Sequence, residues 1–395
     1  MPDLRHALKP DTALPVDREL AVLVGRAWRP GDVPGPSIVV VRGADIRDVS
    51  HLAPTMSELL SLDDPAAALW AHEGERIGSV DDILENTHAD ARDPDIPWLL
   101  APFDLQALKA CGVTFVKSML ERVIEEQAKG DPAGAEAVRA TIAREIGGDL
   151  ARVKPGSAEA ERLKQALIRR GMWSQYLEVG IGPYAEVFTK SQPMSAVGTG
   201  AEVGVHPEST WNNPEPEVVL AIDGRGRAMG ATLGNDVNLR DFEGRSALLL
   251  GRAKDNNASC ALGPFIRLFD AQYSVDDMRS SELALTVEGQ DNFRMEGRSS
   301  LAQISRDPLD LVAQTLSRNH QYPDGLALFT GTMFAPTDDR GAPGMGFTHK
   351  AGDIVTIASP RLGALVNRVT RTTEAPPWTF GTAALMRNLA ARKLI

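Results

Sequence analysis

The sequence predicts an α+β protein dominated by strands, and three observations support that fold class. From residue 184 onward the chain consists of short apolar, β-branched runs separated by Gly, Pro and Asp turns, such as EVVLAIDGRGRAMGATLGNDV and AGDIVTIASPRLGALVNRV. Between residues 115 and 178 the pattern is instead that of charged helices. Strand and helix segments are segregated, so the alternation that builds a doubly wound parallel sheet is missing.

The first hundred residues predict a small α+β domain. ELAVLVGRAW and SIVVVRGADIRDVS have the composition of strands, and TMSELLSL and PAAALWAHEG have that of short helices. The Asp- and Pro-rich stretch THADARDPDIPWLLAPFD, residues 87–104, is typical of a linker. We therefore expect a domain of residues 1–100 followed by a larger domain of residues 101–395.

The charged segment 115–178 predicts three helices. They are FVKSMLERVIEEQAKG, which ends in Lys-Gly, DPAGAEAVRATIAREIGG, which ends in Gly-Gly, and SAEAERLKQALIRRGM, which opens like a capping box. Such helices usually keep one face in solvent. We expect this segment to be a lid over a site in the neighbouring strands, or an insertion.

Composition and charge exclude several classes of protein. The chain has 395 residues, 43% of them hydrophobic, and a net charge of −11, without the basic stripe of a nucleic-acid-binding domain. The N-terminus has no apolar signal region and no window approaches eighteen apolar residues, so we expect a cytoplasmic protein without membrane contact. Cys111 and Cys260 lack metal-type spacing and are expected to be small core residues.

An acidic pair at the start of a strand indicates the chemistry. In WNNPEPEVVLAI, Glu215 and Glu217 are two residues apart, so in a strand both carboxylates face one side, roughly 6 to 7 Å apart. The chain then returns across the turn DGRG, which could bring Asp236 beside them. Three converging carboxylates either take up a proton or bind a divalent cation, and an all-oxygen set favours Mg²⁺, Mn²⁺ or Ca²⁺ over zinc. The alternative is a charged turn with both glutamates in solvent.

The order of motifs resembles the fumarylacetoacetate hydrolase superfamily over residues 184–369. The matching string is NNPEPEVVLAI, GATLGNDVNLRD, GRAKDNNASCALGPFI, LFTGTMFAP, HKAGDIVTI and LGALVNRV. The resemblance implies a strand-rich catalytic domain, a mixed β-sandwich roll, in which Glu215, Glu217 and Asp236 bind Mg²⁺ or a similar ion. It also implies a small 2-oxo acid as substrate, enolised at the metal, and assembly as a homodimer or homotetramer.

The same resemblance assigns roles to further residues. Lys254, in GRAKDNN, occupies the family's lysine position beside the metal, where it contacts substrate oxygens or exchanges the C3 proton. Gly331 and Thr332, in FTGTMF, match the Gly-Thr turn that binds the substrate carboxylate. Lys190, in EVFTKSQPMS, matches a segment at the edge of the site and is a candidate substrate contact.

One departure from the family pattern separates the possible activities. Hydrolases of the family carry a His and a Glu, three residues apart, that activate water, and here Ser118 and Glu121 occupy those positions in GVTFVKSMLERVIEEQ. Serine cannot act as a base near neutral pH as imidazole does. We take Glu121 as a candidate acid/base and Ser118 as a hydrogen-bonding partner of a substrate hydroxyl. Arg122 is expected to pair on the surface with Glu125 or Glu126, and the alternative is that it contacts a substrate oxygen.

The missing histidine favours elimination over hydrolysis. The sequence resembles the family's sugar-acid dehydratases of pentose catabolism, which implies conversion of a 2-keto-3-deoxy-pentonate to 2-oxoglutarate semialdehyde through a metal-stabilised enolate. The first alternative is a metal-dependent hydrolase that cleaves a C–C bond of a 2,4-diketo acid such as an acylpyruvate, with a base from elsewhere in the fold. The second is a binder of 2-oxo acids without turnover.

Overall fold

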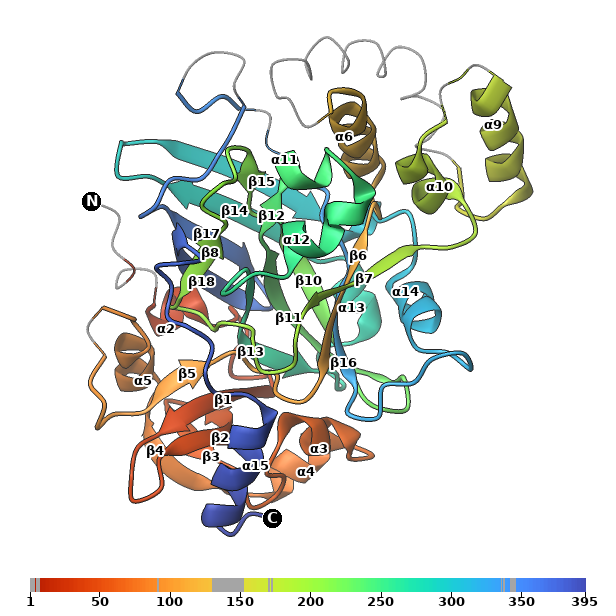
Figure 1. Ribbon diagram of the computed structural model, residues 1–395. Coiled ribbons are helices and arrows are strands. Elements are labelled where there is room, and N and C mark those ends of the chain that lie inside the picture. The colour runs from red at the N-terminus through yellow and green to blue at the C-terminus, as the bar shows by residue number, and fades with distance from the viewer. Residues whose placement is uncertain are drawn as a thin grey trace.

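The computed structural model describes residues 4, 8–90, 92–129, 153–169, 171, 173–334, 336, 338–341 and 346–395. Within them, the strands form one large sheet, a five-stranded sheet and a two-stranded ribbon (Figure 1). In spatial order the large sheet contains β4 (Glu75–Ser79), β3 (Asp45–Asp48), β2 (Gly35–Arg42), β1 (Leu23–Arg29), β13 (Cys260–Leu268), β11 (Ala228–Asp236), β10 (Pro216–Ile222), β16 (Leu326–Phe329), β6 (Ala107–Gly112) and β7 (Glu186–Ser191), with β5 (Trp98–Leu100) beside β1. The five-stranded sheet contains β15 (Arg294–Ser300), β14 (Glu282–Glu288), β17 (Ile354–Ser359), β18 (Gly363–Arg371) and β8 (Glu202–Val205), and the ribbon contains β12 (Asn238–Leu239) and β9 (Asn212–Asn213).

The helices are short and lie around these sheets (Figure 1). They are α2 (Pro10–Ala13), α3 (Met56–Ser61), α4 (Pro65–Ala71), α5 (Val80–Asn86), α6 (Val116–Gln127), α9 (Ala158–Arg169), α10 (Gln175–Ile181), α11 (Arg240–Glu243), α12 (Leu250–Lys254), α13 (Val275–Arg279), α14 (Pro308–Thr315) and α15 (Thr382–Ala391), with 3₁₀ turns η1 (Ala247–Leu249) and η2 (Leu301–Gln303). In the described part of the chain, no helix combines the length and the apolar character needed to cross a bilayer.

The two sheets pack face to face, which confirms the predicted α+β class with a strand-rich catalytic part. Val218 and Leu220 of β10 lie in one apolar cluster with Leu285 of β14 and Ile357 of β17. Alternate residues of β10 point the other way, and Val219 lies in a second cluster with residues of α3. Both faces of β10 are therefore buried, which explains its unbroken apolar sequence.

The N-terminal strands belong to the same sheet as the catalytic part. Strand β1 pairs with β13, so that Leu23 lies opposite Arg267, and the C-terminal helix α15 returns to pack on β2. Just beyond α15, Arg392 donates to the Ser37 hydroxyl at 2.7 Å. The expected linker contains β5, which pairs with β1, so this stretch is built into the sheet. The division at residue 100 stays a prediction.

The charged segment forms helices where it is described. Helix α6 corresponds to the first predicted helix, and α9 to the third, beginning after Ser157, whose hydroxyl accepts the Ala160 amide at 3.1 Å. The second predicted helix, residues 131–148, lies outside the described residues. Apolar residues of α6 and α10, such as Met119 and Leu177, share one cluster, so the two helices pack together beside the sheets (Figure 1).

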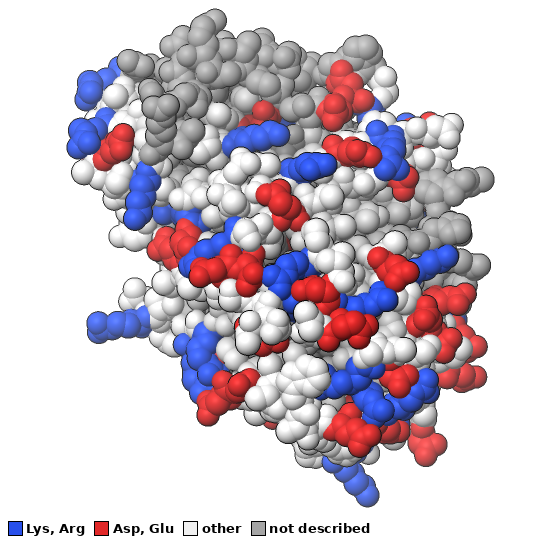
Figure 2. Space-filling view, turned by 180° about the vertical axis from the view of Figure 1, so that it is seen from behind, with Lys and Arg blue, Asp and Glu red and all other residues white. Residues whose placement is uncertain are grey.

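The surface carries both signs of charge. On the face seen in Figure 2, Lys and Arg alternate with Asp and Glu without a large patch of either sign. Many are ion pairs, such as Arg225 with Asp63 at 3.0 Å.

Candidate functional site

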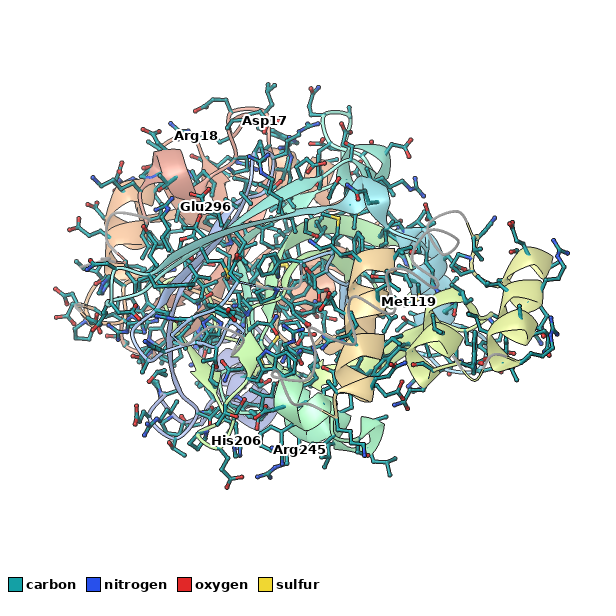
Figure 3. The ribbon with its side chains drawn as sticks, turned by 90° about the horizontal axis from the view of Figure 1, so that it is seen from above. Asp17, Arg18, Met119, His206, Arg245 and Glu296 are labelled. Carbon is teal, nitrogen blue, oxygen red and sulfur yellow. The ribbon has the colours of Figure 1, made fainter. Side chains whose placement is uncertain are left out.

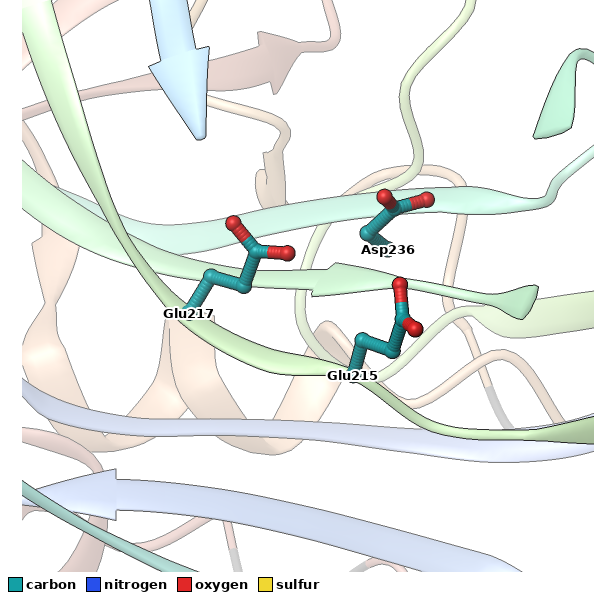
Figure 4. A group of neighbouring side chains, drawn as sticks. All are labelled: Glu215, Glu217 and Asp236. Atoms are coloured by element: carbon teal, nitrogen blue, oxygen red, sulfur yellow. The ribbon is translucent and has the colours of Figure 1, made fainter. Parts of the chain in front are cut away.

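The hairpin of β10 and β11 brings three carboxylates together. Glu217 lies opposite Gly234, and two residues earlier the Asp236 amide donates to the Glu215 carbonyl at 3.1 Å, so Glu215 faces Asp236. Oxygens of Glu215, Glu217 and Asp236 all lie within 4.8 Å of one another (Figure 4). None of the three residues is exposed by more than 4%, so the alternative of a solvated charged turn is wrong.

Two buried lysines contact this group of carboxylates. Lys254, the last residue of α12, donates from Nζ to Glu215 Oε2 at 2.6 Å and to Asp236 Oδ2 at 2.9 Å. Lys190, at the end of β7, is fully buried and donates to the carbonyls of Val237 at 3.1 Å and Lys254 at 2.6 Å. Its Nζ also lies 2.9 Å from Asp236 Oδ1. The structure places Lys190 behind Asp236 and not in the lining of the cavity, so its assignment as a substrate contact stays a prediction.

The Gly-Thr turn holds the remaining glutamate. The Gly331 amide donates to Glu217 Oε2 at 2.6 Å. Gly331 has φ +93°, and a Cβ there would lie 2.0 Å from Thr114 Oγ1, so the turn requires glycine. Thr332 lines the cavity, and among the described residues its amide has no acceptor.

Helix α6 closes the site with different residues from those expected. Arg122 lies 2.5 Å from Glu215 Oε1 through Nη2 and 3.1 Å from Glu243 Oε2 through Nη1. Its side chain is only 12% exposed, so the expectation that Arg122 is a surface residue is wrong. Ser118 lines the cavity and donates to the Phe115 carbonyl at 3.0 Å, and its contact with a substrate hydroxyl stays a prediction. Glu121 points to Arg240 at 3.6 Å and is not among the lining residues.

Glu186, on β7, also lines the cavity, although it was not predicted from the sequence as a site residue. Burial, with the charge of Glu243, raises its pKa to about 7, although Arg122 and Lys254 oppose the shift. A signal was present, since Phe188 also lines the cavity and residues two apart in a strand share a face.

The charges of the site do not balance. Burial raises the pKa of Glu217 well above its usual range, and the charges of Asp236 and Glu215 raise it further. Burial alone would raise the pKa of Asp236 too, but the charges of Lys190 and Lys254 lower it. Five carboxyl groups face three cationic groups, an excess of two negative charges if all are ionised. The carboxyl groups are Glu186, Glu215, Glu217, Asp236 and Glu243, and the cations are Arg122, Lys190 and Lys254.

The donor set fits a hard divalent cation. It consists of carboxylate oxygens, which Mg²⁺, Mn²⁺ and Ca²⁺ prefer. Asp236 Oδ1 is buried and accepts no hydrogen bond in the described structure, although Lys190 lies within ion-pair distance. A buried carboxylate oxygen without a hydrogen-bond donor has a lone pair available for a ligand bond. The cavity beside it has a volume of about 20 Å³, which is room for one water-sized sphere.

Known proteins share this sequence pattern and this fold. Residues 178–370 match the family described as fumarylacetoacetate (FAA) hydrolase C-terminal. A 2-dehydro-3-deoxy-D-arabinonate dehydratase of Saccharolobus solfataricus is 32% identical over 184 residues, which are 47% of this chain and 58% of that protein. A Haloferax volcanii protein named "Probable 2-keto-3-deoxyxylonate dehydratase" is 30% identical over 199 residues, 50% of this chain and 65% of the relative. The chain thus spans less than two thirds of the length of either relative.

Solved structures extend the likeness in fold. A 2-keto-3-deoxy-D-arabinonate dehydratase complexed with magnesium and 2,5-dioxopentanoate has a TM-score of 0.60 at 21% identity, covering 89% of this chain and 99% of that one. A fumarylacetoacetate hydrolase from Exiguobacterium antarcticum has a TM-score of 0.50 at 17% identity, covering 89% of this chain and 100% of that one. Residues 178–370, just under half of the chain, are therefore a fumarylacetoacetate hydrolase C-terminal domain.

Proposed function

We propose that the protein is a divalent-metal-dependent dehydratase that converts a 2-keto-3-deoxy-pentonate to 2-oxoglutarate semialdehyde. The observation that carries this proposal is the buried group of Glu215, Glu217 and Asp236, with Lys254 across two of the carboxylates. Both curated relatives have names of 2-keto-3-deoxy-pentonate dehydratases. The structural neighbour holds magnesium and 2,5-dioxopentanoate, which is the same compound as 2-oxoglutarate semialdehyde.

Glu215, Glu217 and Asp236 would hold Mg²⁺, or Mn²⁺ or Ca²⁺ in its place. When bound, such an ion polarises a 2-oxo group and stabilises the negative charge of an enolate. Lys254 supports the same chemistry from the protein. Burial alone would lower the pKa of Lys254, but the charges of Asp236 and Glu215 raise it overall, so its ammonium is available to hydrogen-bond substrate oxygens.

Dehydration also needs a group that moves protons, and we assign that role to Glu186. A carboxyl group with a pKa of about 7 is poised to exchange protons near neutral pH. Its carboxylate would take the proton from C3, and the same carboxyl would protonate the hydroxyl that leaves C4 as water. The 5-hydroxy-2-oxopent-3-enoate formed is an isomer of the semialdehyde, and transfer of one proton from C5 to C3 and of the C5 hydroxyl proton to C4 completes the conversion. Ser118 would hydrogen-bond a substrate hydroxyl, and the Thr332 turn would receive the substrate carboxylate. Glu121 remains a second candidate for the acid, provided that it turns away from Arg240.

The absence of imidazole favours dehydration over hydrolysis of a 2,4-diketo acid. The described residues that line the cavity include no histidine. Hydrolysis needs a base that activates water, whereas elimination removes a proton and a hydroxyl from the substrate itself. The expected homodimer or homotetramer and the cytoplasmic location belong to this proposal, because they come from the family resemblance and the composition.

Product analysis tests the proposal directly. The protein is stripped with EDTA, supplied with Mg²⁺, and incubated with 2-keto-3-deoxy-pentonates of both configurations at C4 and with an acylpyruvate. Metal-dependent formation of 2-oxoglutarate semialdehyde is the expected result. Pyruvate released from the acylpyruvate alone would establish the hydrolase instead, and substrate binding without product would establish the silent binder. Glu215→Gln should lose activity and its dependence on metal together.

A further inference from the structure

The cavity beside the acidic group is too small for any keto acid. Its volume is about 20 Å³, whereas pockets that hold small organic ligands have volumes of roughly 300 Å³ or more. A wall of the cavity must therefore move before a substrate enters. Ser118 and Arg122 of α6 form part of that wall.

Arg122 ties this wall to one of the three clustered carboxylates. Its guanidinium reaches Glu215 Oε1 at 2.5 Å from α6 and Glu243 Oε2 at 3.1 Å at the end of α11. The contact to Glu243 has the distance of an ion pair but not the geometry of a hydrogen bond, since Glu243 Oε2 accepts none in the described structure. Glu243 can therefore form a closer ion pair with Arg122 when Glu215 binds another cation.

A divalent ion at Glu215 and the Arg122 guanidinium compete for the same negative charge. Lys254 donates a hydrogen bond to Glu215 Oε2, and Arg122 donates one to the other oxygen, Oε1. Two cations that share one carboxylate repel each other, and burial makes that repulsion stronger than it is in water. Apolar residues of α6 pack against α10, so a shift of Arg122 acts on a helix that is packed on a second helix.

We propose that Arg122 is a positioning residue that couples α6 to the metal site. Without the ion it neutralises Glu215 and holds α6 closed, and when the ion binds, it moves toward Glu243 and α6 opens for the substrate. This inference rests on the proposed metal-dependent function, and it adds that metal binding and substrate entry are linked through one arginine.

Arg122→Gln tests the coupling without any need for turnover. Removing the competing charge should tighten Mg²⁺ or Mn²⁺ binding by about tenfold in calorimetry. Hydrogen exchange of residues 116–127 should be slow in the metal-free wild type and faster with Mg²⁺. In R122Q it should be fast with or without the ion. If Arg122 only stabilised the fold, its replacement would weaken both the fold and metal binding. Tighter metal binding together with faster exchange therefore distinguishes a coupling role from a structural one.

Arg245→Gln is the matched control. Arg245 follows α11, is largely exposed and pairs with Asp241 at 3.9 Å (Figure 3). The substitution removes the same charge from a neighbouring place, and it should change metal affinity by less than about twofold because exposed charges are screened. If R122Q does not fold, Arg122→Lys is the second variant, because lysine keeps the charge but cannot contact Glu215 and Glu243 with two separate nitrogens. The hydrogen-exchange rate of residues 116–127 in this variant should lie between the slow rate of metal-free wild type and the fast rate expected for an open helix.

The outcomes separate the two proposals. A wild-type protein that binds neither Mg²⁺ nor Mn²⁺ overturns both the metal site and the coupling. A wild-type protein that binds the ion while R122Q binds it equally or more weakly overturns the coupling alone. Exchange of residues 116–127 that does not respond to Mg²⁺ in wild type also overturns it.

Discussion

Replacing Glu217 with glutamine should separate folding from metal binding. Burial and the charges of Asp236 and Glu215 raise the pKa of Glu217 well above its usual range, which favours the neutral form of this carboxyl in the metal-free protein. Glutamine has nearly the same shape, and its carbonyl oxygen can accept the hydrogen bond that the Gly331 amide donates to Glu217 Oε2 at 2.6 Å. We therefore expect the Tm of metal-free E217Q to lie within about 1 °C of wild type.

The expected effect of metal follows from the length of the chain. A ligand at one hundred times its Kd stabilises the folded state by about 2.7 kcal/mol. With 395 residues and an unfolding entropy of about 2.1 cal/mol/K per residue, the total is about 0.8 kcal/mol/K. The Tm of wild type should thus rise by about 3 °C, whereas that of E217Q should not rise measurably because a neutral amide replaces a carboxylate ligand.

Differential scanning calorimetry after EDTA treatment, with and without MgCl₂, measures both effects. Glu296→Gln is the control, because Glu296 is exposed on β15, far in sequence from the cluster (Figure 3). It should behave as wild type in both conditions. A full rise of Tm with Mg²⁺ in E217Q would show that Glu217 is not a ligand. A large loss of stability without metal would show that the carboxyl is ionised in the folded protein.

Three further substitutions test other parts of the site. The pKa of Glu186 is about 7, and a base must be ionised, so kcat/KM should fall by up to tenfold for each pH unit below that pKa, or below a lower pKa once the ion is bound. E186Q should lose about 100-fold in rate, and its kcat/KM should no longer fall at acidic pH. Gly331→Ala should destabilise the fold by roughly 3 kcal/mol in urea, because its Cβ would lie 2.0 Å from Thr114 Oγ1 at φ +93°. Lys190→Met should cost about 3 kcal/mol in the same assay, because Asp236 Oδ1 loses its buried cation while Lys254 still holds Oδ2, and adding Asp236→Asn should restore part of that stability.

Local periodicity was sufficient to predict the acidic cluster. Glu215 and Glu217 are two residues apart beside a strand, and the turn after Ile222 is short enough for β11 to return beside β10. The register then follows from the hairpin, and it places Asp236 opposite Glu215. Strands β1, β2, β17 and β18 were predicted from their apolar, β-branched sequences, whereas β5 was missed because it has three residues among prolines and aspartates.

The rest of the site depends on contacts between distant segments. Arg122 was assigned to a surface pair because acidic residues follow it at helical spacing, while its contact with Glu215 spans 93 residues of sequence. Glu243 and Glu186 come from two further elements, and no local pattern relates them to the hairpin. Lys190 matched a family segment, but the sequence does not reveal that its ammonium lies behind Asp236 and is fully buried.

The buried cations also determine how the acidic cluster should be interpreted. Three carboxylates in one place suggest that the fold needs a metal, yet Lys190, Lys254 and Arg122 supply enough positive charge for the chain to fold without one. Buried ion pairs add little to stability, because desolvation offsets most of their attraction. A fold that only had to be stable would therefore do as well with apolar residues here. The convergence of three carboxylates, and an Asp236 oxygen that accepts no hydrogen bond, are better explained by a divalent ion that arrives after folding, with Arg122 as the charge that it displaces.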